Sequence, residues 1–124
     1  MKKVLFLCLI VLCLVSCVEK PDLIVTSEMT GYCEIDDMGQ LVVNVQNNGS
    51  VVAPSSVTRI EFGSLGGFEL PTPIIESGQS ARLTVPIPMG CFNPDCGFKI
   101  TVDALNAVQE KREDNNIAIG NCIG

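Results

Sequence analysis

The chain has 124 residues, with 14 acidic against 8 basic side chains, a formal net charge of −6, and neither histidine nor tryptophan. This acidic balance excludes nucleic acid as a partner, because a polyanion requires a basic patch. Without histidine the commonest general base and the Ser-His and Cys-His nucleophile pairs are missing, so we expect no enzyme, no catalytic residue and no cofactor.

The N-terminus has the pattern of a secretion signal. Lys2 and Lys3 precede an unbroken apolar run from Val4 to Val15, and the small residue Ser16 follows. A basic head, a short apolar core and a small residue before the cut are typical of a signal peptide. The run is much shorter than the roughly 20 residues of a membrane-spanning helix. We therefore predict that residues 1–16 are a cleaved lipoprotein signal peptide and not a permanent transmembrane anchor.

The cleavage region Leu14-Val15-Ser16-Cys17 resembles the bacterial lipobox. The resemblance implies diacylglycerol on the Cys17 sulfur, acylation with chains such as palmitate, and a lipid membrane as a partner. Several acyl chains on one residue anchor a protein stably. It also implies a lipid-anchored protein of the bacterial cell envelope. Val18 after the cysteine resembles outer-membrane sorting in Gram-negative bacteria, with the facing left open. The competing interpretation is an ordinary signal peptide in which Cys17 is incidental.

Cleavage would leave about 100 residues, enough for one domain and too few for two. Loss of the two lysines changes the charge to 6 minus 14, or −8. We predict a lipidated cysteine and short tether over residues 17–21 and a single domain over 22–124. The mature chain keeps an even number of further cysteines, which predicts two disulfides in an oxidising compartment but leaves three connectivities open. These are Cys33, Cys91, Cys96 and Cys122.

Alternation of apolar and polar residues predicts strands along most of the domain. Leu41, Val43 and Val45 share one face, opposite Asn44 and Gln46. Prolines near the end of the 81–87 strand favour an edge position, because proline lacks the N–H. Residues 104–114 are rich in helix formers, so a helical turn and a hairpin connection both stay open there. Further strands are predicted at 22–26, 58–62, 81–87, 98–104 and 117–119.

About seven short strands joined by Gly, Pro and Asn turns predict an all-β antiparallel sandwich. Over residues 21–119 the chain also resembles the CARDB family, the immunoglobulin-like "cell adhesion related domain found in bacteria". The quoted segments are Pro21-Asp22-Leu23-Ile24-Val25, Val45-Gln46-Asn47-Asn48-Gly49-Ser50, Ile75-Glu76-Ser77-Gly78-Gln79-Ser80, Val102-Asp103-Ala104-Leu105-Asn106-Ala107-Val108-Gln109-Glu110 and Glu113-Asp114-Asn115-Asn116.

The resemblance implies a single immunoglobulin-like sandwich in which all four cysteines meet at one pole. It favours pairing Cys91 with Cys96 and Cys33 with Cys122, while the other two connectivities stay open. The cysteines are not part of the general family pattern. Four thiolates can hold zinc, but no Cys-x-x-Cys pair is present, so no metal site is assigned to them.

Two groups of residues are candidates for binding. An acidic stretch offers hard oxygen ligands to calcium, namely Asp103, Asn106, Glu110, Glu113 and Asp114. The alternative is a solvated hairpin whose side chains bond turn backbone, which fits the absence of an Asp-x-Asp-x-Asp-Gly loop better. The second group is the glycine-rich segment 63–68, where Leu65 and Phe68 are the candidate contact residues, although Phe68 is equally suited to the core.

By analogy of fold, we expect a membrane-anchored, non-catalytic protein-binding or scaffold module, such as an accessory subunit of an envelope complex. The alternative is a surface adhesin or glycan-binding module. A calcium-binding domain ranks third. The expected partner besides the membrane is another envelope protein or a surface glycan.

Overall fold

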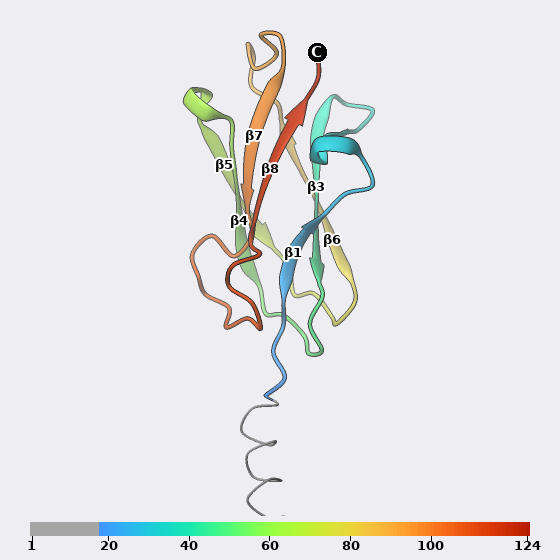
Figure 1. Cartoon of the computed structure of the whole chain (residues 1–124), viewed down its shortest axis with the longest axis vertical. Helices are drawn as coiled ribbons and strands as arrows, with labels where there is room; N and C mark the ends of the chain where they lie inside the picture. Colours follow the sequence, from blue (N-terminus) through green and yellow to red (C-terminus); the bar gives the residue numbers. More distant parts are fainter. Residues whose placement is uncertain (1–17) are drawn as a thin grey trace, which may run out of the picture.

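The computed structural model describes residues 18–124 (Figure 1). The predicted signal peptide, residues 1–16, and the predicted lipidation site Cys17 lie outside the described residues. Within residues 18–124, none of the helices has the length and apolar character needed to cross a bilayer.

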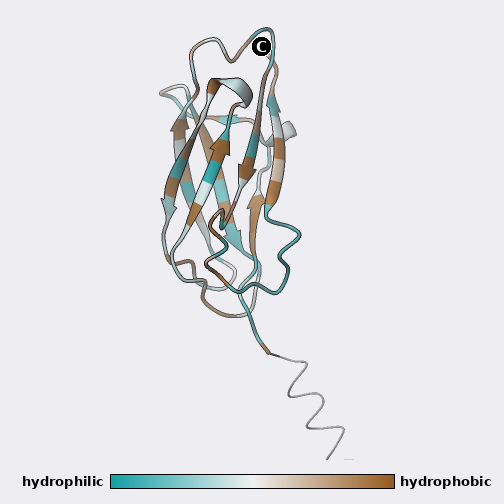
Figure 2. Ribbon diagram, turned by 90° about the vertical axis from the view of Figure 1, so that its left-hand side faces the viewer, coloured by the Kyte–Doolittle hydropathy of each residue, from teal (hydrophilic) through white to brown (hydrophobic). Residues whose placement is uncertain are grey.

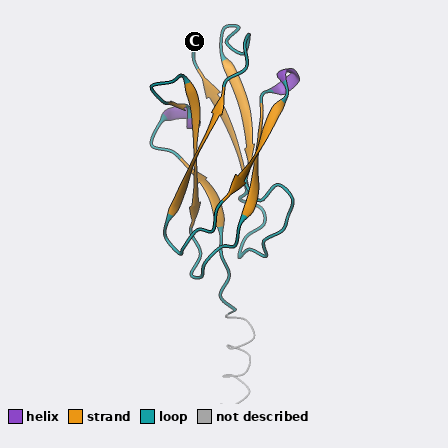
Figure 3. Cartoon of the chain, turned by 180° about the vertical axis from the view of Figure 1, so that it is seen from behind, coloured by secondary structure: helices purple, strands orange, loops and turns teal. Residues whose placement is uncertain are grey.

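Eight antiparallel strands form two packed sheets, which confirms the predicted all-β immunoglobulin-like sandwich. In the first sheet, β3 (Gln40–Asn47) pairs along one edge with β6 (Ser80–Pro86) and along the other with β1 (Leu23–Thr26) and β2 (Glu34–Ile35). The second sheet has the order β5 (Gly67–Thr72), β4 (Ser56–Glu61), β7 (Cys96–Thr101) and β8 (Ile117–Cys122). Two short 3-10 turns, η1 (Thr30–Tyr32) and η2 (Gly63–Leu65), are the helical elements of the described chain (Figure 3).

The core follows the alternation read from the sequence. Leu41, Val43 and Val45 of β3 are buried and face the second sheet, while Asn44 and Gln46 stay partly exposed on the outer face. Apolar and polar residues alternate along the strands, as the hydropathy colouring shows (Figure 2). The predicted edge position of the 81–87 strand is confirmed, because β6 pairs with β3 alone.

Two strands were not predicted from the sequence. β2 has two residues and is held only by pairing with β3, too short for a periodic signal. β5 contains Gly67 and Pro71, which weaken a strand pattern. β5 is an edge strand, where the missing N–H of Pro71 can face away from the sheet. Gly67 is needed for a different reason, because a side chain there would collide with the carbonyl oxygen of Ile60 on β4.

Residues 104–114 form turns rather than a helix, which settles the alternative left open above. Asp103 and Asn106 take positive φ angles of 48° and 52°. The Asp103 carboxylate accepts the backbone N–H groups of Ala107 at 2.9 Å and Val108 at 3.1 Å. These bonds occupy N–H groups that a helix would need, so local side-chain bonding overrides helix propensity.

The loops gather at the two ends of the sandwich (Figures 1 and 3). The chain enters at one end, here named the proximal pole, beside the 48–55, 73–79 and 102–116 loops. The opposite end, the distal pole, holds the 36–39 turn, η2, the 87–95 loop and C-terminal residues 123–124. The two poles therefore differ in their distance from any anchor attached to the N-terminus.

Candidate functional site

The start of the domain is fixed at the proximal pole by five contacts, named here the entry clamp. Lys111 N donates to Pro21 O at 2.8 Å, and Leu23 N donates to the Glu110 carboxylate at 2.7 Å. These two bonds join the first residues of the fold to a loop nearly ninety positions later. The remaining three contacts all involve Asp22.

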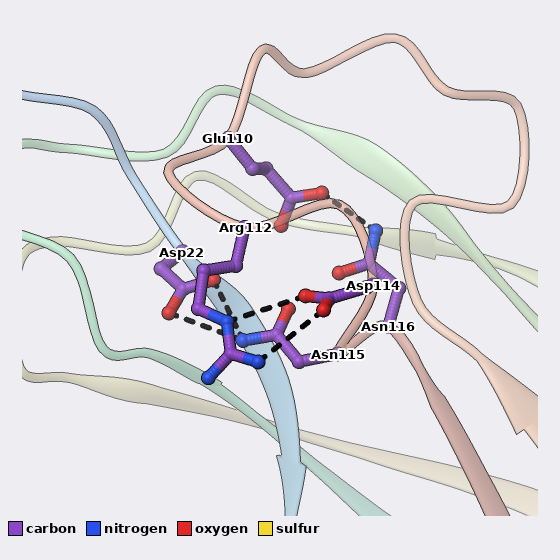
Figure 4. A network of polar contacts seen from close by, with 6 residues as sticks. All are labelled: Asp22, Glu110, Arg112, Asp114, Asn115 and Asn116. Atoms are coloured by element: carbon purple, nitrogen blue, oxygen red, sulfur yellow. Dashed lines mark hydrogen bonds and ion pairs between the residues drawn. The ribbon is translucent and has the colours of Figure 1, made fainter.

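Asp22 is buried and bonded through both its backbone and its side chain. Its N–H donates to Asn47 Oδ1 at 3.1 Å, its carbonyl accepts Asn48 N at 2.7 Å, and its carboxylate accepts Asn115 Nδ2 at 3.0 Å (Figure 4). The chain is therefore held from Pro21 onward.

Asn47, at the end of β3, is a polar residue within the core. It is fully buried, and its amide nitrogen donates to Val51 O at 2.7 Å and Ile75 O at 3.0 Å. Its Oδ1 also accepts the N–H of Gly49, whose Cβ, if present, would lie 2.6 Å from Asp22 N. Gly49 does not have a positive φ, and its lack of a side chain lets it lie close to the backbone of residues 20–22, just before β1.

Glu110 is the buried acid of the entry clamp. The residue is 5 % exposed, and its carboxylate accepts Leu23 N on one oxygen and Asn116 Nδ2 at 2.6 Å on the other (Figure 4). Burial raises its pKa to about 7, an effect opposed by these two hydrogen bonds and reinforced by the nearby carboxylates of Glu113 and Asp103. Asn116 Oδ1 is buried without a partner among the described residues, so a protonated Glu110 can donate to it after the Asn116 amide rotates.

Three of the five calcium candidates come together at this pole. Carboxylate oxygens of Asp103, Glu110 and Glu113 lie within 4.8 Å of one another. Each of these carboxylates already accepts a backbone N–H, including Glu110 N to Glu113 Oε1 at 2.9 Å. This is the arrangement expected of side chains that bond turn backbone, the alternative favoured in the sequence analysis.

The other two calcium candidates do not belong to this carboxylate group. Asp114 is exposed and pairs with Arg112 at 3.2 Å, and the hydrogen bond and charge of that guanidinium lower the pKa of Asp114 (Figure 4). Asn106 is exposed within the turn, where its N–H donates to Asp103 O at 2.9 Å.

The cysteines meet at the distal end of the sandwich. The bonds are Cys33–Cys122, with Cα atoms 5.2 Å apart, and Cys91–Cys96, with Cα atoms 4.9 Å apart. This is the pairing favoured above. Cys96 and Cys122 are also direct partners in the β7–β8 ladder, which brings both disulfides together. The C-terminal strand is thus cross-linked to the segment before β2.

The two candidate contact residues in segment 63–68 differ in position. Leu65 is exposed in η2, whereas Phe68 is half-buried, packs against the core and meets Phe62 edge to face at 6.4 Å between ring centroids. Phe68 also lines a shallow hollow of about 290 Å³ on the outer face of β4 and β5. Their role in binding stays a prediction.

Sequence reasoning missed Asp22, Asn47, Asn115 and Asn116 as members of a network. Asp22 and Asn115 are 93 positions apart, and no local pattern connects them. All four residues belong to segments quoted for the resemblance described above, but nothing in that resemblance identifies them as partners.

Comparison with solved structures places the fold among known domains. The crystal structure of the CARDB domain of a Pyrococcus furiosus protein, in complex with di-metal ions, is 24% identical, with a TM-score of 0.64 over 86% of this chain and 94% of that chain. The solution structure of the same domain is 25% identical, with a TM-score of 0.60 over 86% and 96%. A domain of a Methanosarcina acetivorans protein assigned to the cell surface is 19% identical, with a TM-score of 0.69 over 84% and 91%.

None of the curated proteins compared is a significant match. The CARDB family model matches residues 20–119, which include all eight strands except the last three residues of β8. This chain therefore belongs to the CARDB family.

Proposed function

We propose that the mature protein is a lipid-anchored module of the bacterial cell envelope that binds another protein through its distal pole. CARDB domains are non-catalytic, binding-type modules. The cell-surface assignment of the Methanosarcina acetivorans protein with the same fold supports a location in the envelope. The lipobox-like Leu14-Val15-Ser16-Cys17 supports attachment through the N-terminus.

The observation that carries this proposal is the exposure of large apolar side chains at the distal pole. Met89 in the 87–95 loop is 97 % exposed, Met38 in the 36–39 turn 84 %, and Ile123 at the C-terminus 81 %. Phe92 is also exposed, and its Cδ1 lies 3.2 Å from where a Cβ on Gly124 would stand, so this loop and the C-terminus are neighbours. Methionine and aromatic residues are enriched at protein interfaces, and methionine adapts readily to a partner.

The short tether supports a role close to the membrane. Cys17 would be separated from the entry clamp by Val18–Lys20 alone, at most about 10 Å of extended chain. The proximal pole would then lie against the bilayer, and the distal pole would face away from it. This geometry suits a subunit or scaffold of an envelope complex, whereas a long-reach adhesin needs a longer stalk.

Two experiments test the proposal. Mass spectrometry of the mature N-terminal peptide should find acylated Cys17, and palmitate labelling should be lost in Cys17→Ser; a mature chain with a free Cys17 thiol would contradict the anchor.

Cross-linking in native membranes should recover one stoichiometric envelope protein. That product should be lost with Met89→Asp and kept with Ile74→Asp, which alters an exposed apolar residue in a proximal loop. Recovery of glycan instead would favour the adhesin.

A second function, calcium binding at the proximal pole, is favoured by the approach of the Asp103, Glu110 and Glu113 oxygens within 4.8 Å. The di-metal complex of the Pyrococcus furiosus domain makes the test worthwhile. If calcium binds the folded chain, millimolar calcium should raise the melting temperature, and Glu113→Gln should abolish the rise. An unchanged melting temperature would leave these carboxylates with their turn-bonding role.

A further inference from the structure

The outer face of the first sheet carries a polar groove, which arises because its edge strand is interrupted. β1 and β2 pair with the same edge of β3, at Asn44–Asn47 and at Leu41–Val42. Between them, residues 27–33 leave the first sheet and pack against β8 of the second. There a Cβ on Gly31 would lie 2.7 Å from Asn121 O, and Cys33 is bonded to Cys122. This crossing leaves open space beside β3.

The space has a volume of about 510 Å³. Pockets that hold small ligands enclose about 300–1,000 Å³. Seven of its eight lining residues have polar side chains, and the eighth is Met29. The polar residues come from β1, the crossing segment, β2, β3 and β6, and they are Thr26, Ser27, Glu28, Glu34, Asn44, Gln46 and Ser80.

The strand register holds these side chains on one face. Asn44 stands opposite Thr26 of β1, and Gln46 stands opposite Ser80 of β6, another lining residue. Both amides point outward because Val43 and Val45, the alternating residues, are buried in the core. Asn44 Nδ2 donates to Glu34 Oε2 at 3.0 Å, which joins the amide to a carboxylate on the far side of the interruption. Glu34, Asn44, Gln46 and Ser80 therefore stand on hydrogen-bonded strands, while Ser27 and Glu28 belong to the crossing segment.

The chemistry of the lining selects among ligand classes. None of the described residues lining the groove is lysine, arginine or aromatic, which disfavours anions and ligands that bind by stacking. One methionine is too little apolar surface for a lipid chain. Carboxylates accept hydrogen bonds, while amides and hydroxyls both donate and accept. A ligand with many hydroxyl groups matches this mixed set.

We propose that this groove binds a saccharide, either neutral or carrying an amino group that Glu28 and Glu34 would accept. The site is separate from the distal pole, so the inference goes beyond the protein partner proposed above. Hydrogen bonds would recognise the saccharide, and because no aromatic side chain stacks on the sugar ring, we expect weak affinity for one end of a glycan chain. Many such contacts along a glycan would add by multivalency when the lipoprotein is dense on a membrane.

Methionine methyl NMR of the detergent-solubilised mature lipoprotein tests this directly. Met29 lines the groove, whereas Met38 and Met89 belong to the distal pole and serve as internal controls. Titration with neutral and amino tetrasaccharides, cellotetraose and chitosan tetramer, should shift the Met29 signal in a saturable way and leave the other two unchanged. Oligogalacturonate, an anionic tetrasaccharide, should give no shift.

Gln46→Ala and Asn44→Ala should each weaken the binding at least tenfold, while Gln79→Ala, at an exposed glutamine outside the lining, should not change it. Circular dichroism melting of each variant establishes that it is folded. The proposal is overturned if Met29 does not respond to any of the probes, if the alanine variants bind as well as the wild type, or if a neutral tetrapeptide produces the same shift. Failure of the wild type to cross-link any envelope protein, together with an intact Met29 response, would overturn the proposed docking pole alone.

Discussion

Replacing Glu110 by glutamine should change how the stability of the domain depends on pH. Burial raises the pKa of Glu110 to about 7 in the folded chain, against an ordinary value of 4.5 that applies to the unfolded chain. Between these two values the unfolded chain has released the proton and the folded chain keeps it. Rising pH therefore favours the unfolded chain over this window.

The magnitude follows from the two pKa values. A difference between 4.5 and about 7 corresponds to up to about 3 kcal/mol of folding free energy. The wild type has all of this stability below pH 4.5 and has lost it above pH 7. In Glu110→Gln the side chain does not titrate, and Asn116 can turn its unpartnered Oδ1 toward the new amide. The variant should gain up to about 3 kcal/mol relative to the wild type between pH 4 and pH 8.

Urea unfolding with disulfides intact, followed by far-ultraviolet circular dichroism at pH 4, 5, 6, 7 and 8, measures this difference. Every other titrating group is common to both proteins, so subtracting the two curves isolates Glu110. Glu76→Gln, at an exposed glutamate of a proximal loop, is the matched control and should give a flat difference. A Glu110→Gln difference that stays constant within about 0.5 kcal/mol, or falls with pH, would refute the assignment of a destabilising buried charge.

Further changes test other parts of the fold. Removing the Cys33–Cys122 disulfide by a double serine substitution should lower the free energy of unfolding by about 4–5 kcal/mol, since it closes a loop of 89 residues; an unchanged urea midpoint would contradict this. Thr58→Val should cost about 1–3 kcal/mol because it leaves the buried Thr72 hydroxyl, now 2.7 Å away, without a partner, and the double Thr58→Val/Thr72→Val variant should recover most of it. Gly49→Ala should cost about 1–3 kcal/mol in the same assay, because its methyl group would collide with the backbone of residues 20–22.

Short-range patterns predicted the sandwich because buried and exposed residues alternate along several strands. β4, β7 and β8 bury every second residue, and β3 does so from Val43 to Asn47, so period two is visible in the sequence itself. β5 was not predicted because it is stabilised by pairing with β4, and its glycine and proline, which are tolerated at an edge, weaken the strand pattern. Helix formers between Ala104 and Asp114 suggested a helix because propensity ignores the side-chain bonds of Asp103. The errors therefore lie where tertiary or side-chain bonding decides the backbone.

The sequence revealed which acidic residues gather at the proximal pole but not which residues they bond. The acidic residues between 103 and 114 were visible as a group, and three of them do meet. Glu110 accepts Leu23 N and the neighbouring Asn115 donates to Asp22, and both of these partners lie about ninety positions earlier in the chain, so no short-range pattern connects them. The polar groove likewise depends on an interruption of the edge strand, which is a property of pairing between distant segments.

The disulfides and the entry clamp lie at opposite poles, and this separation bears on binding. The entry clamp fixes the proximal pole by hydrogen bonds, whereas the distal loops carry little regular structure of their own. The Cys91–Cys96 bond closes the loop that holds Phe92, and the Cys33–Cys122 bond fixes the end of β8, directly before Ile123. Exposed side chains on cross-linked loops lose less conformational freedom when a partner docks. The two disulfides therefore stiffen the surface proposed to bind another protein, and the Cys33–Cys122 bond also holds the crossing segment beside the polar groove.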